Sequence, residues 1–294
     1  THKPGVGGSN PPLATKKNNM TNLKMFCLTL DSNHLNKIKK LEYIPVGLGQ
    51  EDFSTDWHTD KVGQSISNKN PFYGEYTFHY WIWKNYLHEI KTEWVGFCQY
   101  RKFFSEIDIK KYESLDYEYF NKILVKNIDE KSQNYECILG NKFSVENFKL
   151  SKIIKNHLLH FLSNPVTFFN KKKRNLRFHF DLFHGKGNLD LAINLLDEEN
   201  KKDFKKFMLE KNAFNPHNMF FCKKEILKNY YEVVFPWLEK CENVFGFNDL
   251  KGYGLKRIYG FLAERFLSYW FSKRFRVKEF PIIVKDLSDY QKQM

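Results

Sequence analysis

The order of apolar and polar residues predicts alternating strands and helices along most of the chain. Four short apolar runs have the length of buried strands: residues 23–30, 41–46, 94–99 and 135–140. A further run at 276–284 predicts a closing strand. Longer amphipathic or aromatic stretches predict helices at 72–87, 143–169, 189–196, 203–211, 223–239 and 256–271. This alternation predicts an α/β fold, with a mixed, mostly parallel sheet flanked by helices.

The stretch from residue 65 to 104 carries the strongest local signals. Asn70 can cap a helix, and Pro71 suits the first turn because the N–H that proline lacks has no partner there. From residue 72 to 87, aromatic side chains occur on nearly every face, which predicts a buried helix. A buried strand follows at 94–99.

Charged residues stand at the end of this predicted strand, in the order Tyr100, Arg101 and Lys102. Ligands of open α/β sheets bind beyond the carboxyl ends of the strands. Two adjacent cations at such an end therefore indicate an anion, with phosphate as the first candidate. The alternative interpretation is that Arg101 and Lys102 are the solvated end of a strand.

Separated motifs in this region resemble a bacterial family, domain of unknown function 4422, whose members are described as capsular or exopolysaccharide glycosyltransferases. The motifs are Ile66-Ser67-x-Lys69-Asn70, Tyr73-x-Glu75, Tyr80-Trp81-Ile82-Trp83-Lys84-Asn85 and Gly96-Phe97-x-x-Tyr100-Arg101-Lys102-Phe103-Phe104. A later match is Gly260-Phe261-Leu262-Ala263-Glu264-Arg265. The chain departs from the family at three places: at Gln64 or Ser65, where asparagine is usual, at Gln99, where histidine is usual, and at Lys102, where a second arginine is usual. The Gln99 departure puts a proton-transfer role at that position in doubt.

The resemblance implies the type A glycosyltransferase fold. It also implies transfer of a sugar from a nucleoside-diphosphate donor to a growing capsular, lipooligosaccharide or exopolysaccharide chain. The implied partners are that donor and a saccharide or lipid-linked saccharide acceptor. Two rival interpretations are a basic nucleic-acid-binding protein and a non-catalytic scaffold of the capsule system.

Many type A enzymes hold the donor diphosphate through a divalent metal on an Asp-x-Asp motif at a strand end. The corresponding strand end here has no carboxylate pair, so no cofactor is firmly implied; Mg²⁺ or Mn²⁺ is the alternative. We expect Arg101 and Lys102 to stabilise the leaving diphosphate by fixed charge instead. The further candidate donor contacts are Gly47, Lys69, Asn70 and Tyr100.

An inverting transferase also needs a carboxylate near the acceptor hydroxyl as general base. The candidates, in order of preference, are Glu75, Asp249 and Glu264. Glu264 and Arg265 fall inside an apolar helical pattern, and buried charges are costly unless they are paired. Either both charges are paired with groups around them and so fix the helix in place, or Glu264 faces the site. The candidate acceptor contacts, which we place in polar loops beside helices or strands, are His184, His217 and Asn218.

The chain carries a formal net charge of +13. This charge fits nucleic acid, an anionic membrane surface or a phosphate-bearing substrate. Against nucleic acid, the cations are scattered and the aromatic residues fall at buried helical positions. The cations Lys171, Lys172, Lys173 and Arg174 form either a solvated loop or a contact with anionic lipid headgroups or a lipid-diphosphate acceptor.

The five cysteines include no C-x-x-C pair, which argues against a disulfide framework and a structural zinc site. No apolar run approaches the roughly 18–20 residues of a membrane span. We expect a cytoplasmic protein that can be peripheral to the inner membrane. Residues 20–285 should form one domain, residues 1–19 a disordered, non-native extension before Met20, and residues 286–294 a loose tail. Residues 51–70 predict a polar loop, which is either an active-site flap or a plain surface connection.

Overall fold

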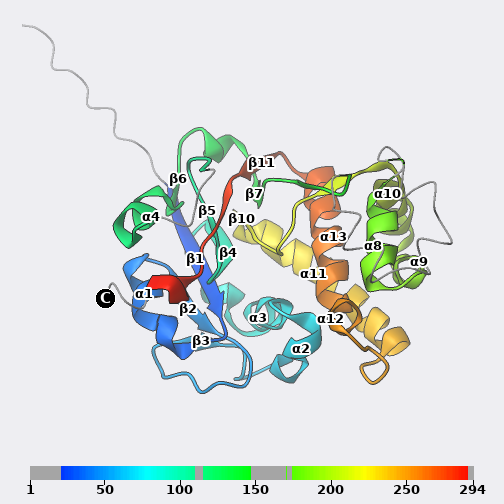
Figure 1. The fold of residues 1–294 in the computed structure, drawn as a ribbon, viewed down its shortest axis with the longest axis horizontal. Helices are drawn as coiled ribbons and strands as arrows, with labels where there is room; N and C mark the ends of the chain where they lie inside the picture. Colours follow the sequence, from blue (N-terminus) through cyan, green and yellow to red (C-terminus); the bar gives the residue numbers. More distant parts are fainter. Residues whose placement is uncertain (1–20, 110–114, 147–169, 171–173, 291–294) are drawn as a thin grey trace, which may run out of the picture.

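The computed structural model describes residues 21–109, 115–146, 170 and 174–290. Its centre is a β-sheet whose main strands run in the order β11-β7-β10-β4-β1-β2-β3 (Figure 1). Strand β10 is antiparallel to both neighbours, whereas the other neighbouring pairs in this order are parallel. The strands span β1 Thr21–Thr29, β2 Ile44–Gly47, β3 His58–Thr59, β4 Trp94–Gln99, β7 Cys137–Gly140, β10 Phe220–Lys223 and β11 Val277–Phe280. The predicted mixed, mostly parallel α/β sheet is confirmed.

Short strands extend this sheet at two places, where β4 stops and where β1 starts. Strand β5 (Lys102–Phe104) folds back from β4 and pairs with β12 (Ile282–Val284), and β6 (Asn127–Ile128) pairs with the start of β1. The predicted closing strand at 276–284 is divided into β11 and β12 at Pro281, which has no N–H to donate to a ladder. The predicted loop at 51–70 contributes the edge strand β3.

A second, two-stranded sheet replaces the start of the helix predicted at 143–169. Strand β8 (Phe143–Ser144) pairs with β9 (Ala213–Phe214). The prediction is therefore wrong for residues 143–144, whose backbone groups pair across the chain; residues 147–169 lie outside the described residues.

Helices cover both faces of the main sheet. Along β1, Met25 and Cys27 belong to the core under α1 (Leu35–Lys40) and α4 (Tyr117–Ile123), whereas Phe26 and Leu28 belong to the larger core on the other face. That larger core is built with α3 (Tyr76–Trp81), α11 (Lys224–Phe245) and α13 (Ile258–Arg274). Successive residues of a strand point to opposite faces, so β1 is apolar on both sides because both sides are buried.

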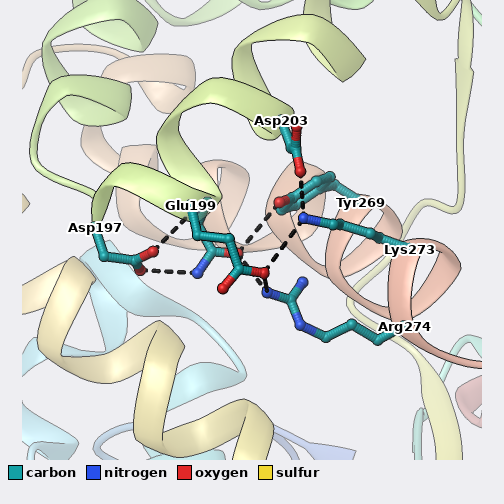
Figure 2. Close-up of polar contacts among 7 residues, drawn as sticks. Asp197, Glu199, Asp203, Tyr269, Lys273 and Arg274 are labelled. Carbon is teal, nitrogen blue, oxygen red and sulfur yellow. Dashed lines mark hydrogen bonds and ion pairs between the residues drawn. The ribbon is translucent and has the colours of Figure 1, made fainter.

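The green helices α8 (Leu176–His184), α9 (Asn188–Asn194) and α10 (Glu198–Glu210) form a group beside α13 in Figure 1. A polar cluster joins α10 to α13 (Figure 2). In it, Asn200 accepts from the Tyr269 hydroxyl at 3.2 Å and from Arg274 at 2.9 Å, and Lys273 pairs with Asp203. Asn200 also donates to Asp197, the N-cap of α10, at 2.8 Å. The cluster ties the start of α10 to the end of α13.

The aromatic helix predicted at 72–87 is broken near its start. Helix α2 (Asn70–Tyr73) ends at Gly74, whose φ of 59° lies in the region that favours glycine, and α3 begins two residues later. A π-helical turn (Ile82–Tyr86) and a 3-10 turn (Leu87–Glu89) complete the segment. Because of this break, Glu75 lies at the junction of α2 and α3 and not inside one continuous helix.

The segment predicted as a loose tail is partly packed. Residues Leu287–Tyr290 form a 3-10 turn in which Leu287 and Tyr290 are buried, and the Leu287 N–H donates to the Tyr100 carbonyl at 3.1 Å. The prediction of a tail from residue 286 is thus wrong for this turn. Residues 1–19 and 291–294 lie outside the described residues.

The basic run at 171–174 is described only at its last residue. Arg174 is buried and donates to the Glu146 carbonyl at 2.6 Å, so this arginine does not present its charge to a lipid headgroup. That part of the membrane-contact prediction is wrong, and Lys171, Lys172 and Lys173 lie outside the described residues. Within the described part of the chain, no helix combines the length and apolarity needed to cross a membrane.

Candidate active site

A pocket lies where the parallel strands β1 and β4 end. Its walls come from the residues after β1, β2 and β4, from the α2–α3 junction and from the residue before α13: Thr29, Leu30, Leu48, Asn70, Gly74, Glu75, Gln99, Tyr100, Arg101 and Arg257 are among them. The pocket has a volume of about 80 Å³. Ligand pockets usually exceed roughly 300 Å³, so this one can enclose only part of a ligand, such as a phosphate group.

Among the predicted donor contacts, Arg101 brings positive charge to the lining of this pocket, and Lys102 follows it in sequence but lies outside the lining residues. The Arg101 guanidinium lies 4.8 Å from the centre of the Tyr100 ring, and both residues line the pocket. Lys102 begins β5 and is half-buried, and this burial lowers the pKa of its amine, against the opposing effect of Glu75 and Glu264. Within the described residues neither Arg101 nor Lys102 forms an ion pair, so both charges are available to an anion.

Arg257, a third cation at the pocket, was missed by the sequence analysis. Its Nη2 atom lies 3.4 Å from Oε2 of Glu75. Arg257 immediately precedes α13, where the positive end of the helix dipole disfavours a cation. The position gave at most a weak signal, because Arg257 is also the C-cap of the short helix before it, where the helix dipole favours a cation.

Glu75, the first candidate base, is held by two side chains. Its Oε1 atom accepts from the Gln99 amide, and its Oε2 atom faces Arg257. The same Gln99 nitrogen donates to the His217 carbonyl at 2.9 Å. Gln99 therefore links the end of β4, the α2–α3 junction and the turn before β10.

Glu264 and Arg265 pair with each other. Oε2 of Glu264 accepts from Arg265, which is 1% exposed and stacks 3.6 Å from the centre of the Phe214 ring. Oε1 of Glu264 accepts from the His217 backbone N–H at 2.5 Å. Glu264 thus supports the His217–Asn218 turn, whose φ angles of 82° and 54° are unusual for residues other than glycine.

His217 lies close to Lys102 across this turn. Burial, and then the charge of Lys102, lower the pKa of His217 to about 4, so its imidazole is neutral at pH 7. Asn218 is buried and donates to the Gly260 carbonyl at 3.2 Å. Its Oδ1 atom is buried without a hydrogen-bond partner within the described residues.

Three predicted donor contacts have structural partners. A Cβ atom on Gly47 would collide with the Phe53 ring, so the close approach that this glycine permits is to a side chain. Lys69 pairs with Glu242 at 2.7 Å and does not line the pocket. Asn70 does line it, but its amide donates to the Gly74 carbonyl at 3.0 Å and stabilises the helix break.

His184 and Asp249 are not brought to the pocket. The segment predicted as a substrate-facing loop forms α8, and His184 at its end is buried, stacked on Phe261 and 3.0 Å from the Gly254 carbonyl. Burial lowers its pKa to about 3. Asp249 is exposed between α11 and α12 (Tyr253–Lys256) and does not line the pocket. The prediction that His184 lies in a polar loop facing the substrate is therefore wrong, because His184 is the last residue of α8.

The pocket does not fit a divalent metal. Glu75 is the carboxylate among its lining residues, and both of its oxygens already face protein donors. Within the described residues, no group of three or more histidine, cysteine, aspartate or glutamate side chains could hold a metal ion.

Comparison with known proteins identifies the fold. The family described as Domain of unknown function (DUF4422) matches residues 24–275. The apo structure of the WbbM bifunctional glycosyltransferase is similar, with a TM-score of 0.66 and 21% sequence identity. The alignment covers 90% of this chain and 45% of that chain, so this chain spans less than half of that protein. At this identity the likeness shows a glycosyltransferase-like fold. No curated protein is significantly similar in sequence.

Proposed function

The chain belongs to the family described as Domain of unknown function (DUF4422), and from this premise and its fold we propose that it is a glycosyltransferase with a nucleoside-diphosphate sugar donor. The acceptor is a growing capsular, lipooligosaccharide or exopolysaccharide chain. One observation carries the proposal. Two cations, Arg101 and Lys102, follow the end of β4, and neither has an ion-pair partner among the described residues.

The proposed role of these cations follows from the charge that develops in the reaction. When the bond between sugar and diphosphate breaks, negative charge grows on the leaving phosphate oxygens. Arg101 and Lys102 are already in place to stabilise it, and Lys102 acts from a half-buried position where charges interact more strongly than in water. A pocket of about 80 Å³ has room for a phosphate group, so in this proposal the sugar and the base lie outside its narrow part.

Glu75 is the proposed general base. It accepts the proton of the acceptor hydroxyl while that oxygen bonds to the anomeric carbon and the bond to the diphosphate breaks. Gln99 orients the carboxylate through Oε1. Glu264 is better suited to support the His217 turn, because its Oε2 atom is held closely by the buried Arg265. Oε2 of Glu75, by contrast, has only a 3.4 Å contact with the part-exposed Arg257.

We also propose a cytoplasmic location for the enzyme. All five cysteines are buried and free, which is the usual state in a reducing compartment.

Calorimetric titration with nucleoside diphosphates, together with turnover of nucleotide sugars, tests the proposal. We expect one or more diphosphates to bind the wild-type protein. Arg101→Ala should lower turnover by about 10²–10³-fold, as the loss of one charge-stabilising donor does elsewhere. The matched control is Arg276→Ala, which removes the same charge from an exposed position beside Glu136. Equal turnover in Arg101→Ala and the control would reject the assignment.

A further inference from the structure

Arg257 reaches the pocket through a gap that a glycine leaves open. A Cβ atom on Gly74 would collide with Nη2 of Arg257, and it would also be strained by the positive φ of 59°. The break between α2 and α3 therefore does two things at once. It turns Glu75 into the pocket, and it leaves the space in which the Arg257 guanidinium lies.

The contact between Arg257 and Glu75 is loose. The Nη2–Oε2 distance of 3.4 Å lies beyond the usual range for an N–H···O hydrogen bond. The two side chains are 29% and 21% exposed, so water competes with the pair. A bidentate contact between arginine and a carboxylate or phosphate is shorter and stronger. The pair is thus a weak one that a better anion can displace.

The charges around the pocket favour such an anion. Arg101, Lys102 and Arg257 are three cations, and their facing anions are Glu75 and Glu264. Glu264 is already committed to the buried Arg265. Among these charges Glu75 alone opposes the three cations, which leaves the pocket with an excess of positive charge.

We propose that Arg257 is a donor-phosphate ligand that Glu75 holds in reserve. In the empty pocket, Arg257 pairs loosely with Glu75; when a diphosphate enters, the guanidinium moves its hydrogen bonds to the phosphate oxygens. This exchange frees Oε2 of Glu75 as donor binding is completed. Glu75 then becomes available as a base only in the presence of the leaving group, which limits unproductive proton transfer. The inference rests on the proposed function.

The exchange makes two opposite predictions for one probe, inorganic pyrophosphate, titrated calorimetrically into the full chain. Arg257→Ala should weaken binding by about 10- to 100-fold, because it removes charge-assisted hydrogen bonds to the anion. Glu75→Gln keeps an oxygen that can accept from Gln99 but removes the competing charge, so it should tighten binding by roughly 3- to 10-fold. Loss of the Glu75 charge alone would tighten binding equally with and without Arg257, whereas the exchange predicts that the tightening in Glu75→Gln disappears in the double variant Glu75→Gln with Arg257→Ala.

Lys256→Ala is the matched control, since Lys256 is the neighbouring cation and lies 5.7 Å from the Phe72 ring centre, outside the pocket lining. Its affinity should stay within twofold of wild type. Thermal melts check that each variant folds, and Arg257→Lys, which keeps the charge but not the planar fork, replaces Arg257→Ala if that variant unfolds.

The outcomes separate the two proposals. If wild type binds neither pyrophosphate nor any nucleoside diphosphate, the proposed function fails. If wild type binds and Arg101→Ala weakens binding, but Arg257→Ala and Glu75→Gln both match wild type, the exchange is rejected and the donor site stands. Weaker binding in Arg257→Ala, with a tightening in Glu75→Gln that is lost when Arg257 is alanine, supports the exchange; a tightening of equal size in both backgrounds rejects it.

Discussion

Glu264→Ala should be among the most destabilising single substitutions in this protein. The change removes the acceptor of two donors, the Arg265 guanidinium and the His217 backbone N–H. Arg265 is 1% exposed and would remain buried with its charge uncompensated. The His217–Asn218 turn, with its positive φ angles, would also lose its support.

The magnitude follows from the burial of this pair. Removing one partner of a buried ion pair costs about 3–5 kcal/mol, and losing the hydrogen bond to the His217 N–H adds about 1 kcal/mol. The Phe214 ring at 3.6 Å and His179 Nδ1 at 3.3 Å remain near the guanidinium, so we expect a total near the lower end of the sum, about 4 kcal/mol.

Urea denaturation followed by circular dichroism measures this loss, with an unchanged m-value as the check that the denatured state is the same. Glu264→Gln leaves one side-chain oxygen to accept from the two donors, so one of the two contacts is lost. We expect this variant to lose about 1–3 kcal/mol of unfolding free energy. The double variant Glu264→Ala with Arg265→Met removes the stranded charge, so it should be more stable than Glu264→Ala alone. A loss below about 1 kcal/mol in Glu264→Ala, or a double variant less stable than the single one, would refute the reasoning.

Three further predictions concern stability. Burial lowers the pKa of both His79 and His184 from 6.5 to about 3. The stability that comes from burying each neutral imidazole is therefore fully present above pH 6.5 and is lost as the pH falls from 6.5 towards 3. At pH 5, each histidine should lower the free energy of unfolding by about 2 kcal/mol relative to pH 7.5. Urea midpoints at the two pH values measure this, and His184→Phe should flatten the pH dependence; an equal slope in that variant contradicts it. Asn200→Ala should lower stability by about 1–3 kcal/mol, since Tyr269 and Arg274 lose their common acceptor, and a melting temperature equal to wild type would count against the α10–α13 cluster. Gly47→Ala should reduce the yield of folded protein because the added Cβ meets the Phe53 ring, whereas Gly246→Ala, with no atom near the added Cβ, isolates the cost of a positive φ alone.

The amino-acid sequence alone is enough to predict the type of most elements and the chemistry of one strand end. The apolar run at 94–99 is β4, and Arg101 and Lys102 stand at its end. These predictions succeed because the length and composition of a short run decide whether it can be buried as a strand. Since β1 and β4 are parallel, their carboxyl ends then meet at one edge of the sheet.

Which charges meet depends on how distant segments pack in the folded chain. Arg257 is 182 positions from Glu75, and Lys69 is 173 positions from the Glu242 that neutralises it. His184 has the same side chain whether it faces a substrate or the core, and the packing of α8 against Phe261 turned it inward. The break at Gly74 is equally non-local, because it is the guanidinium of a distant arginine that occupies the space a side chain would need. Local periodicity reports the solvent exposure of a residue, whereas the partner of a polar group depends on how remote segments pack.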